Sequence, residues 1–187
     1  SRVFESEAAT GSRNRAIAYM LDSFGALDTH PDAAIALYFR QCAVQVNTDD
    51  LAVMGTTIAC GGANPRTGRR VFSQEVAQRL LSVMTTCGMY DAAGDWMSEI
   101  GVPAKSGVSG AIMGALPGRA GIATYAPRLD KHGTSVRGRA IFERLSDELD
   151  LHLLDDPHRQ VSLAQHRGHP VDQTLTLGGD DHLPALG

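Results

Sequence analysis

VPAKSGVSGAIMGALPGRAGIATY, residues 102–125, is the stretch that decides the fold class. It is rich in glycine and small apolar residues, and it is interrupted at Pro117-Gly118. A proline followed by a glycine favours a tight turn between two extended segments. We therefore predict strands over 108–116 and 120–125, joined by this turn into an antiparallel hairpin.

Helical periodicity dominates the sequence on both sides of the hairpin. Thr10 and Ser12 are candidate N-caps of the first helix and Ser73 of the fourth, because a hydroxyl can accept hydrogen bonds from the free amides of a first turn. The predicted helices run from 10–12 to Gly25, and over 31–44, 49–60, 73–87, 92–100 and 136–153. Helices packed on an antiparallel sheet make this an α+β fold.

Composition excludes several classes of function. The chain has 187 residues and a formal net charge of -4, which gives no electrostatic case for binding nucleic acid. No apolar run approaches the roughly 20 residues of a membrane span, so we expect no membrane partner. The three cysteines, Cys42, Cys60 and Cys87, lie in apolar helical segments. We predict that they are buried thiols of a protein in a reducing compartment, the cytoplasm.

Periodicity fades from Asp155 onward, where Asp, His, Gly and Pro dominate. We interpret 156–187 as a polar tail or linker. His166 and His169 have a spacing that could serve a metal, but no cysteine or acidic partner has ligand spacing to them. We therefore predict no metal site there.

The segment Ala104-Lys105-Ser106-Gly107-Val108 carries the clearest chemical signal. A K-[ST]-G sequence on a strand is one of three elements of the serine β-lactamase and penicillin-binding fold. Its glycine allows a substrate to approach the strand backbone, Lys105 brings positive charge, and the amide after the glycine can donate to a developing oxyanion. Taken alone, the tripeptide also fits an exposed turn before a strand.

Tyr90 lies in the segment Cys87-Gly88-Met89-Tyr90-Asp91, at the predicted end of the fourth helix. Gly88 can terminate that helix, so that Tyr90 projects from a tight turn. A tyrosine hydroxyl held near the ammonium of Lys105 can act as an acid or a base. The alternative is a tyrosine whose ring packs in the core and whose hydroxyl reaches the surface.

Glu7 and Asn14 lie on either side of Gly11 in ESEAATGSRNR, residues 5–15. Together they offer an acceptor and a donor, which suits the α-ammonium and α-carboxylate groups of a free amino acid. Helix capping accounts for Thr10 and Ser12 as an alternative, but accounts less well for Glu7 and Asn14.

These segments closely resemble the serine-dependent glutaminase family. The matching stretches are ESEAATGSRNRAIAYML, YFRQCAVQV, DDLAVMGTTIACGGANPRTGRRV, LLSVMTTCGMYD, VPAKSGVSGAI and LDKHGTSVRGRAIFERLSDELDLHLL. The resemblance implies that residues 1–155 are the C-terminal part of a catalytic domain with a β-lactamase/transpeptidase-like fold. It also implies hydrolysis of L-glutamine to L-glutamate and ammonia, without a metal or organic cofactor, by a homo-oligomeric enzyme.

The resemblance also assigns roles to individual residues. Glu7 matches the family's carboxylate that binds the substrate α-ammonium, and Asn14 and Tyr38 match groups that hold its α-carboxylate. Tyr90 matches a tyrosine beside the nucleophile that assists proton transfer. The backbone amide of Val108 matches a donor of the oxyanion hole. Lys105 is expected to supply local charge without contacting the substrate directly.

Part of the family pattern is not found in this sequence, including an upstream tyrosine and an asparagine of the pocket. The family's nucleophile is the serine of an S-x-x-K motif, but Val102 and Arg128 stand three residues before Lys105 and Lys131, the only two lysines. We expect the nucleophile to lie upstream of Ser1, and this chain alone to be nearly inert.

Three other interpretations remain open. The chain could belong to another hydrolase of this fold that acts on penicillin-like or peptide substrates. It could be an inactive relative that binds amino acids without turning them over. It could also be a fragment that folds only together with an N-terminal part.

Overall fold

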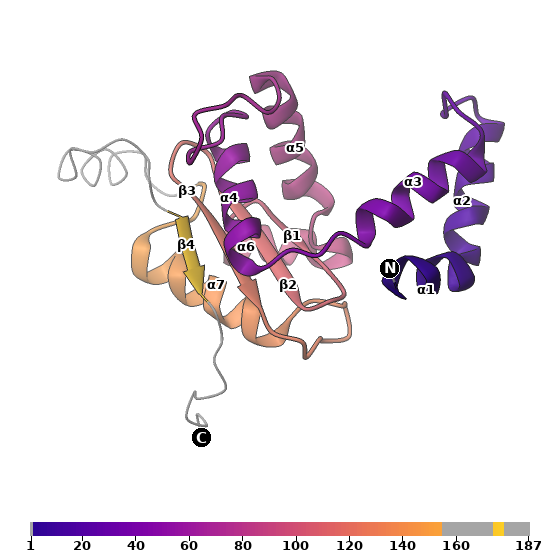
Figure 1. Cartoon of the computed structure of the whole chain (residues 1–187). Helices are drawn as coiled ribbons and strands as arrows, with labels where there is room; N and C mark the ends of the chain where they lie inside the picture. Colours follow the sequence, from indigo (N-terminus) through magenta and orange to yellow (C-terminus); the bar gives the residue numbers. More distant parts are fainter. Residues whose placement is uncertain (1, 155–173, 178–187) are drawn as a thin grey trace. The chain divides into compact units, whose positions relative to one another are not determined.

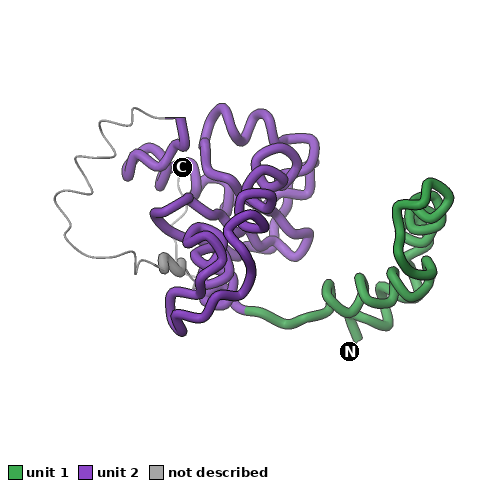
Figure 2. The backbone as a smooth tube through the Cα atoms, turned by 90° about the horizontal axis from the view of Figure 1, so that it is seen from above, with its two compact units in different colours: residues 1–46 green, residues 47–187 purple. Residues whose placement is uncertain are grey.

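The computed structural model describes residues 2–154 and 174–177. The chain divides into two compact units, residues 1–46 and residues 47–187, which Figure 2 shows in green and purple. None of the described helices is long and apolar enough to cross a membrane.

Unit 1 consists of three helices, α1 (Arg2–Thr10), α2 (Ser12–Ser23) and α3 (Pro31–Cys42). Gly11 separates α1 from α2, and a Cβ atom there would lie 2.2 Å from Cζ of Phe39 and 2.7 Å from the carbonyl oxygen of Glu7. Only a glycine therefore allows the buried ring of Phe39 on α3 to pack against this junction.

The structure corrects the predicted start of the first helix. Thr10 ends α1, and its hydroxyl donates to the carbonyl of Ser6 at 2.8 Å instead of capping a helix. The N-cap of α2 is Gly11, with no side-chain hydrogen bond, so neither Thr10 nor Ser12 caps the helix. The prediction for α3 is confirmed, with Pro31 in its first turn.

Unit 2 is built on a sheet whose strands are β1 (Ala104–Ser106), β2 (Ala111–Leu116), β3 (Ala120–Tyr125) and β4 (Thr174–Leu177). They lie side by side in chain order, as Figure 1 shows. The first three strands are antiparallel, and β4 is parallel to β3. The predicted hairpin is confirmed, because Leu116 pairs with Ala120 across Pro117-Gly118.

The first strand of that hairpin begins later than predicted. Val108 lies in a turn, in which the Gly107 amide donates to the Ala111 carbonyl at 2.9 Å and the Gly110 amide donates to the Gly107 carbonyl at 2.9 Å. Gly110 adopts a φ of 98°, a conformation that favours glycine. The sequence AKS before this turn forms β1, a strand that the periodicity did not predict.

Helices cover both faces of this sheet: α4 (Thr48–Ala59), α5 (Gln74–Cys87), α6 (Ala93–Glu99) and α7 (Val136–Leu149). A Cβ atom on Gly121 would lie 2.1 Å from the Thr56 amide nitrogen, so α4 contacts β3 backbone to backbone. A Cβ atom on Gly114 would instead meet the ring of Phe142 at 2.6 Å. Gly114 pairs with Ile122, so Gly114 and Gly121 face opposite sides, and α4 and α7 cover opposite faces.

The main core of unit 2 lies on the α7 face. Trp96 and Phe142 are each 1% exposed, and their ring centroids are 5.3 Å apart. The indole N–H of Trp96 donates to the Val102 carbonyl at 2.7 Å, which satisfies its only buried donor. This core fixes the segment that leads into β1.

Side-chain caps set several helix starts in unit 2. Ser73 caps α5 as predicted, because its hydroxyl accepts from the Val76 amide at 3.3 Å. Ser135 caps α7 in the same way, accepting from the Gly138 amide at 3.1 Å. The C-terminus of α7 is at Leu149 and not at 153, because Asp150 adopts a left-handed conformation with a φ of 49°.

The predicted burial of the cysteines is wrong for two of the three. Cys42 and Cys87 are exposed, each at the last position of its helix, and only Cys60 is partly buried. Burial raises the pKa of the Cys60 thiol. Of the predicted tail, the structure describes only 174–177, which form β4, while His166 and His169 lie outside the described residues.

Candidate active site

The turn after α5 packs against the start of β1. Gly88 follows α5, and a Cβ atom there would lie 1.9 Å from the Ala104 carbonyl oxygen. The Ser106 amide donates to the Gly88 carbonyl at 3.1 Å. This backbone contact joins the CGMYD and AKSG segments that sequence analysis singled out separately.

The contact brings Tyr90 and Lys105 together. Nζ of Lys105 lies over the ring of Tyr90, 4.4 Å from its centroid, which is the geometry of a cation–π interaction. Lys105 also donates a hydrogen bond to the Ser106 carbonyl. In unit 2 the Lys105 ammonium therefore lies against the face of the Tyr90 ring, whereas the prediction from the sequence concerned the tyrosine hydroxyl.

Tyr90 has an unusual backbone conformation. Its φ is 56°, and among the described non-glycine residues only Asp150 shares a positive φ. A non-glycine residue in this region costs about 1–3 kcal/mol, and such strain is concentrated at functional sites. The tyrosine side chain is 45% exposed, so a substrate could reach it.

Val108 presents its amide on the turn between β1 and β2. The residue is 75% exposed. Within the described part of the chain, no backbone carbonyl accepts a hydrogen bond from its N–H. This amide is therefore available as a donor to a substrate oxygen, as an oxyanion hole requires.

The other three predicted site residues belong to unit 1. Glu7 lies in α1 and Asn14 in the first turn of α2, and both are partly buried. Tyr38 is exposed on α3, next to the buried Phe39. The structure thus divides the predicted residues between the two units, with Tyr90, Lys105 and Val108 in unit 2 and the other three in unit 1.

Arg15 holds unit 1 together around Glu7 and Asn14. Its guanidinium donates to the Ala8 carbonyl of α1 and lies 5.8 Å from the centroid of the Phe39 ring of α3. One side chain of α2 therefore contacts both neighbouring helices. Sequence analysis gave it no role, because its partners are set by the packing of three helices.

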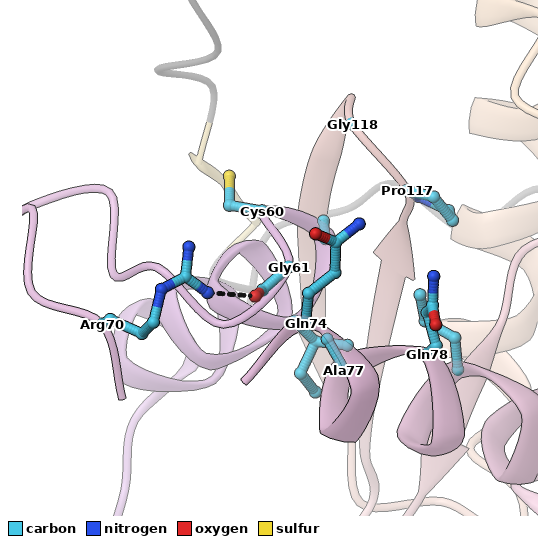
Figure 3. A pocket seen from close by; sticks show the side chains of 11 residues that line it. Cys60, Gly61, Arg70, Gln74, Ala77, Gln78, Pro117 and Gly118 are labelled. Atoms are coloured by element: carbon cyan, nitrogen blue, oxygen red, sulfur yellow. Dashed lines mark hydrogen bonds between the residues drawn. The ribbon is translucent and has the colours of Figure 1, made fainter. Parts of the chain in front are cut away.

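A cavity of about 420 Å³ lies elsewhere in unit 2, and Figure 3 shows Arg70, Gln74 and Gln78 around it. The guanidinium of Arg70 donates to the Gly61 carbonyl at 2.8 Å. None of the predicted site residues lines this cavity. Gln74 begins α5 and Cys87 ends it, so the cavity and the Tyr90 turn lie at opposite ends of a helix about 20 Å long.

Asp91, which follows Tyr90 in the chain, and its partner His132 were not predicted as site residues. Nδ1 of His132 lies 3.0 and 3.1 Å from the two carboxylate oxygens of Asp91. The hydrogen bond from His132 lowers the pKa of Asp91, and the positive charge of the neighbouring Lys131 adds to this effect. The two partners are 41 residues apart, so no local spacing could have revealed the pair.

Comparison with known proteins gives a consistent result. The Glutaminase family model matches residues 1–154. A glutaminase of Clavibacter michiganensis subsp. michiganensis is 55% identical over 150 residues, 80% of this chain and 46% of the relative. Glutaminase 1 of Bradyrhizobium diazoefficiens is 50% identical over 166 residues, 88% of this chain and 27% of the relative.

A solved structure supports the same relationship. The Bacillus subtilis glutaminase YbgJ, in covalent complex with 5-oxo-L-norleucine formed by reaction with 6-diazo-5-oxo-L-norleucine, superposes with a TM-score of 0.78 at 36% identity. The match covers 82% of this chain and 55% of that one. The chain spans less than half the length of the two curated relatives above.

Proposed function

This chain belongs to the glutaminase family, and we propose that it is the C-terminal part of a serine-dependent glutaminase that hydrolyses L-glutamine to L-glutamate and ammonia. Within the family, the observation that carries the proposal is the position of Tyr90 against Lys105, with the Val108 amide on the following turn. Tyr90 would provide the proton-transfer group and Lys105 a positive charge over its ring. The Val108 amide would provide the oxyanion donor on the turn after β1.

The proposed chemistry proceeds through an acyl-enzyme. A serine upstream of this chain attacks the side-chain amide carbon of glutamine, and a lysine three residues after that serine accepts its proton. Tyr90 passes a proton to the leaving nitrogen, so that the C–N bond breaks and ammonia departs. The Val108 amide stabilises the tetrahedral oxyanion, and water then hydrolyses the γ-glutamyl ester.

Unit 1 is proposed to recognise the amino-acid end of the substrate. Glu7 would bind the α-ammonium, and Asn14 and Tyr38 would hold the α-carboxylate. The partly buried positions of Glu7 and Asn14 support this role, since partly desolvated polar groups bind charged ligands more strongly than exposed ones.

We further propose that residues 1–155 form part of one catalytic domain in a cytoplasmic homo-oligomer. The apolar side chains that unit 1 exposes support its packing against further protein, since Phe24 is 78% exposed and Leu37 58%. The expectation that 156–187 form a polar tail remains a proposal for the residues outside β4.

Ammonia release from L-glutamine by the full-length protein tests the proposed function, with L-asparagine as the control substrate. Turnover specific for L-glutamine is the expected result. Turnover of a chromogenic β-lactam in place of glutamine would point to another hydrolase of this fold. Glutamine binding without ammonia release would identify a binding protein and refute the enzymatic proposal.

The reactivity of YbgJ suggests a second test. In 6-diazo-5-oxo-L-norleucine a ketone stands at the carbon that carries the amide in glutamine, and YbgJ forms a covalent complex from it. Incubation of the full-length protein with this compound should produce one covalent adduct per chain, measured by mass spectrometry. An unmodified mass after prolonged incubation would contradict a glutaminase nucleophile.

A further inference from the structure

We propose that Asp91 and His132 form a positioning pair that holds Tyr90 in its left-handed backbone conformation. The catalytic part of this inference rests on the proposed function, because Tyr90 is taken there as the proton-transfer group. The structural part, that the pair fixes the Tyr90 turn, is independent of any activity.

Tyr90 needs restraint from its neighbours. Its φ of 56° is a strained conformation, which persists only where the surroundings determine it. On the N-terminal side, the hydrogen bond from the Ser106 amide fixes the Gly88 carbonyl. On the C-terminal side, Tyr90 begins the short 3₁₀ turn Tyr90–Ala92, whose start has no side-chain cap. A side chain from another part of the fold, His132, adds a restraint on that side through its contact with Asp91.

His132 is held rigidly enough to provide that restraint. The carboxylate of Asp130 accepts from the backbone amides of His132 at 2.8 Å and of Thr134 at 3.0 Å. The Asp130 amide in turn donates to the Thr134 carbonyl at 2.8 Å. The loop is closed by an isolated bridge between Leu129 and Ser135, and Ser135 caps α7. The imidazole therefore projects from a loop whose backbone is tied at several points.

The contact itself is specific in direction. Nδ1 of His132 lies 3.0 and 3.1 Å from the two carboxylate oxygens of Asp91. The imidazole N–H therefore points between these two oxygens. The side chain of His132 is 34% exposed and that of Asp91 is 70% exposed. A pair this exposed contributes little to global stability. Its effect is local, because Asp91 directly follows the strained residue.

Three variants test the pair. His132→Ala removes the donor, whereas His132→Asn keeps an N–H at nearly the position of Nδ1. Arg79→Ala is the matched control, because Arg79 and Glu75 form an exposed ion pair of 2.7 Å on α5, the helix that leads to Gly88. All variants are made in the full-length protein.

The first measurement is amide hydrogen exchange in residues 88–93, where the Ala92 amide donates to the Met89 carbonyl. Loss of the restraint allows the turn to open more often, so exchange there should become roughly fivefold faster. We expect this acceleration in His132→Ala, and exchange within twofold of wild type in His132→Asn and Arg79→Ala. Unchanged exchange in His132→Ala would overturn the inference, whatever reaction the protein catalyses.

The second measurement is glutamine turnover. His132→Ala should lower kcat about fivefold with little change in KM, and His132→Asn should restore most of it. In a Tyr90→Phe background, His132→Ala should have no further effect, because the pair acts through Tyr90. An equal loss in both backgrounds would overturn the catalytic role of the pair. Absence of turnover in the wild-type protein would refute the proposed function and, with it, that catalytic role, whereas the exchange result would still decide the structural part.

Discussion

Unit 1 and unit 2 differ in how they use their apolar side chains. Unit 2 buries the large side chains of its core, with Trp96 and Phe142 in direct contact between α6, α7 and the sheet. Unit 1 buries one large side chain, Phe39, and exposes most of its others. These exposed residues are Val3, Ile17, Tyr19, Met20, Leu21, Phe24, Leu37, Tyr38, Val44 and Val46.

This difference shows what each group of predicted site residues depends on. Tyr90, Lys105 and Val108 are placed by the pairing of β1 with β2 and by the buried core of unit 2. Glu7, Asn14 and Tyr38 lie on helices that bury few large side chains, among them Phe39, whose ring packs against Gly11. We therefore expect the two groups to respond differently to substitution.

The largest expected effect is on the free energy of unfolding, which should respond differently to loss of an aromatic side chain in each unit. Phe142→Ala should lower the free energy of unfolding by about 3–5 kcal/mol, because it leaves a cavity beside Trp96. Phe24→Ala in unit 1 should change it by less than about 0.5 kcal/mol. Denaturant unfolding of the 187-residue chain measures both. A comparable cost at Phe24 would mean that unit 1 has a core of its own around that residue.

Two glycines of unit 2, Gly88 and Gly94, test how closely the Tyr90 turn packs against β1. Gly88→Ala would place a Cβ atom 1.9 Å from the Ala104 carbonyl oxygen and should cost about 1–3 kcal/mol, with loss of glutamine turnover. Gly94→Ala meets nothing within 4 Å and lies in α6, so it should stabilise by about 0.5–1 kcal/mol. Equal effects at the two sites would contradict the close contact between Gly88 and β1.

Substitutions of serines at helix N-termini should give a smaller difference in stability between the two units. Ser135→Ala removes a buried hydroxyl that caps α7 and donates to the Ala126 carbonyl at 2.8 Å, so it should cost about 1–2 kcal/mol. Ser12→Ala in unit 1 should be nearly neutral, because Ser12 does not cap α2. Thermal unfolding measures both. A loss of about 1 kcal/mol of unfolding free energy in Ser12→Ala would mean that Ser12 caps α2, as its position in the sequence predicted.

The smallest expected effect concerns pH. The folded-state pKa of Asp91 lies below its ordinary value, so the contribution of this carboxylate to stability is complete above a pH of about 4 and is lost as the pH falls through the lowered pKa. The difference in unfolding free energy between the wild type and Asp91→Asn should therefore diminish in acid. A difference that grows as the pH falls below about 4 would have the wrong sign for this pair.

Local patterns predicted the elements whose signals lie within a few neighbouring residues. The turn at Pro117-Gly118, the proline at the start of α3 and the Ser73 cap of α5 belong to this class. For Tyr90 the sequence left two alternatives, a hydroxyl near Lys105 or a ring packed in the core, and in the structure the Lys105 ammonium lies over the ring.

The remaining features depend on contacts between distant segments. The break between α1 and α2 depends on the ring of Phe39, and β1 exists because three residues find partners in β2 and Gly88. The Asp91–His132 pair joins two loops 41 residues apart. None of these contacts leaves a periodicity or a spacing that a single sequence could show.

The central proposal is that Glu7 binds the substrate α-ammonium and Tyr90 transfers a proton, and steady-state kinetics of Glu7→Gln and Tyr90→Phe test it most directly. Loss of a charged hydrogen bond of about 1.5–3 kcal/mol should raise KM for L-glutamine by roughly 10- to 100-fold in Glu7→Gln, with kcat little changed. Tyr90→Phe should lower kcat by about 10²-fold or more at a similar KM. An unchanged KM in Glu7→Gln, or an unchanged kcat in Tyr90→Phe, would contradict this division of roles.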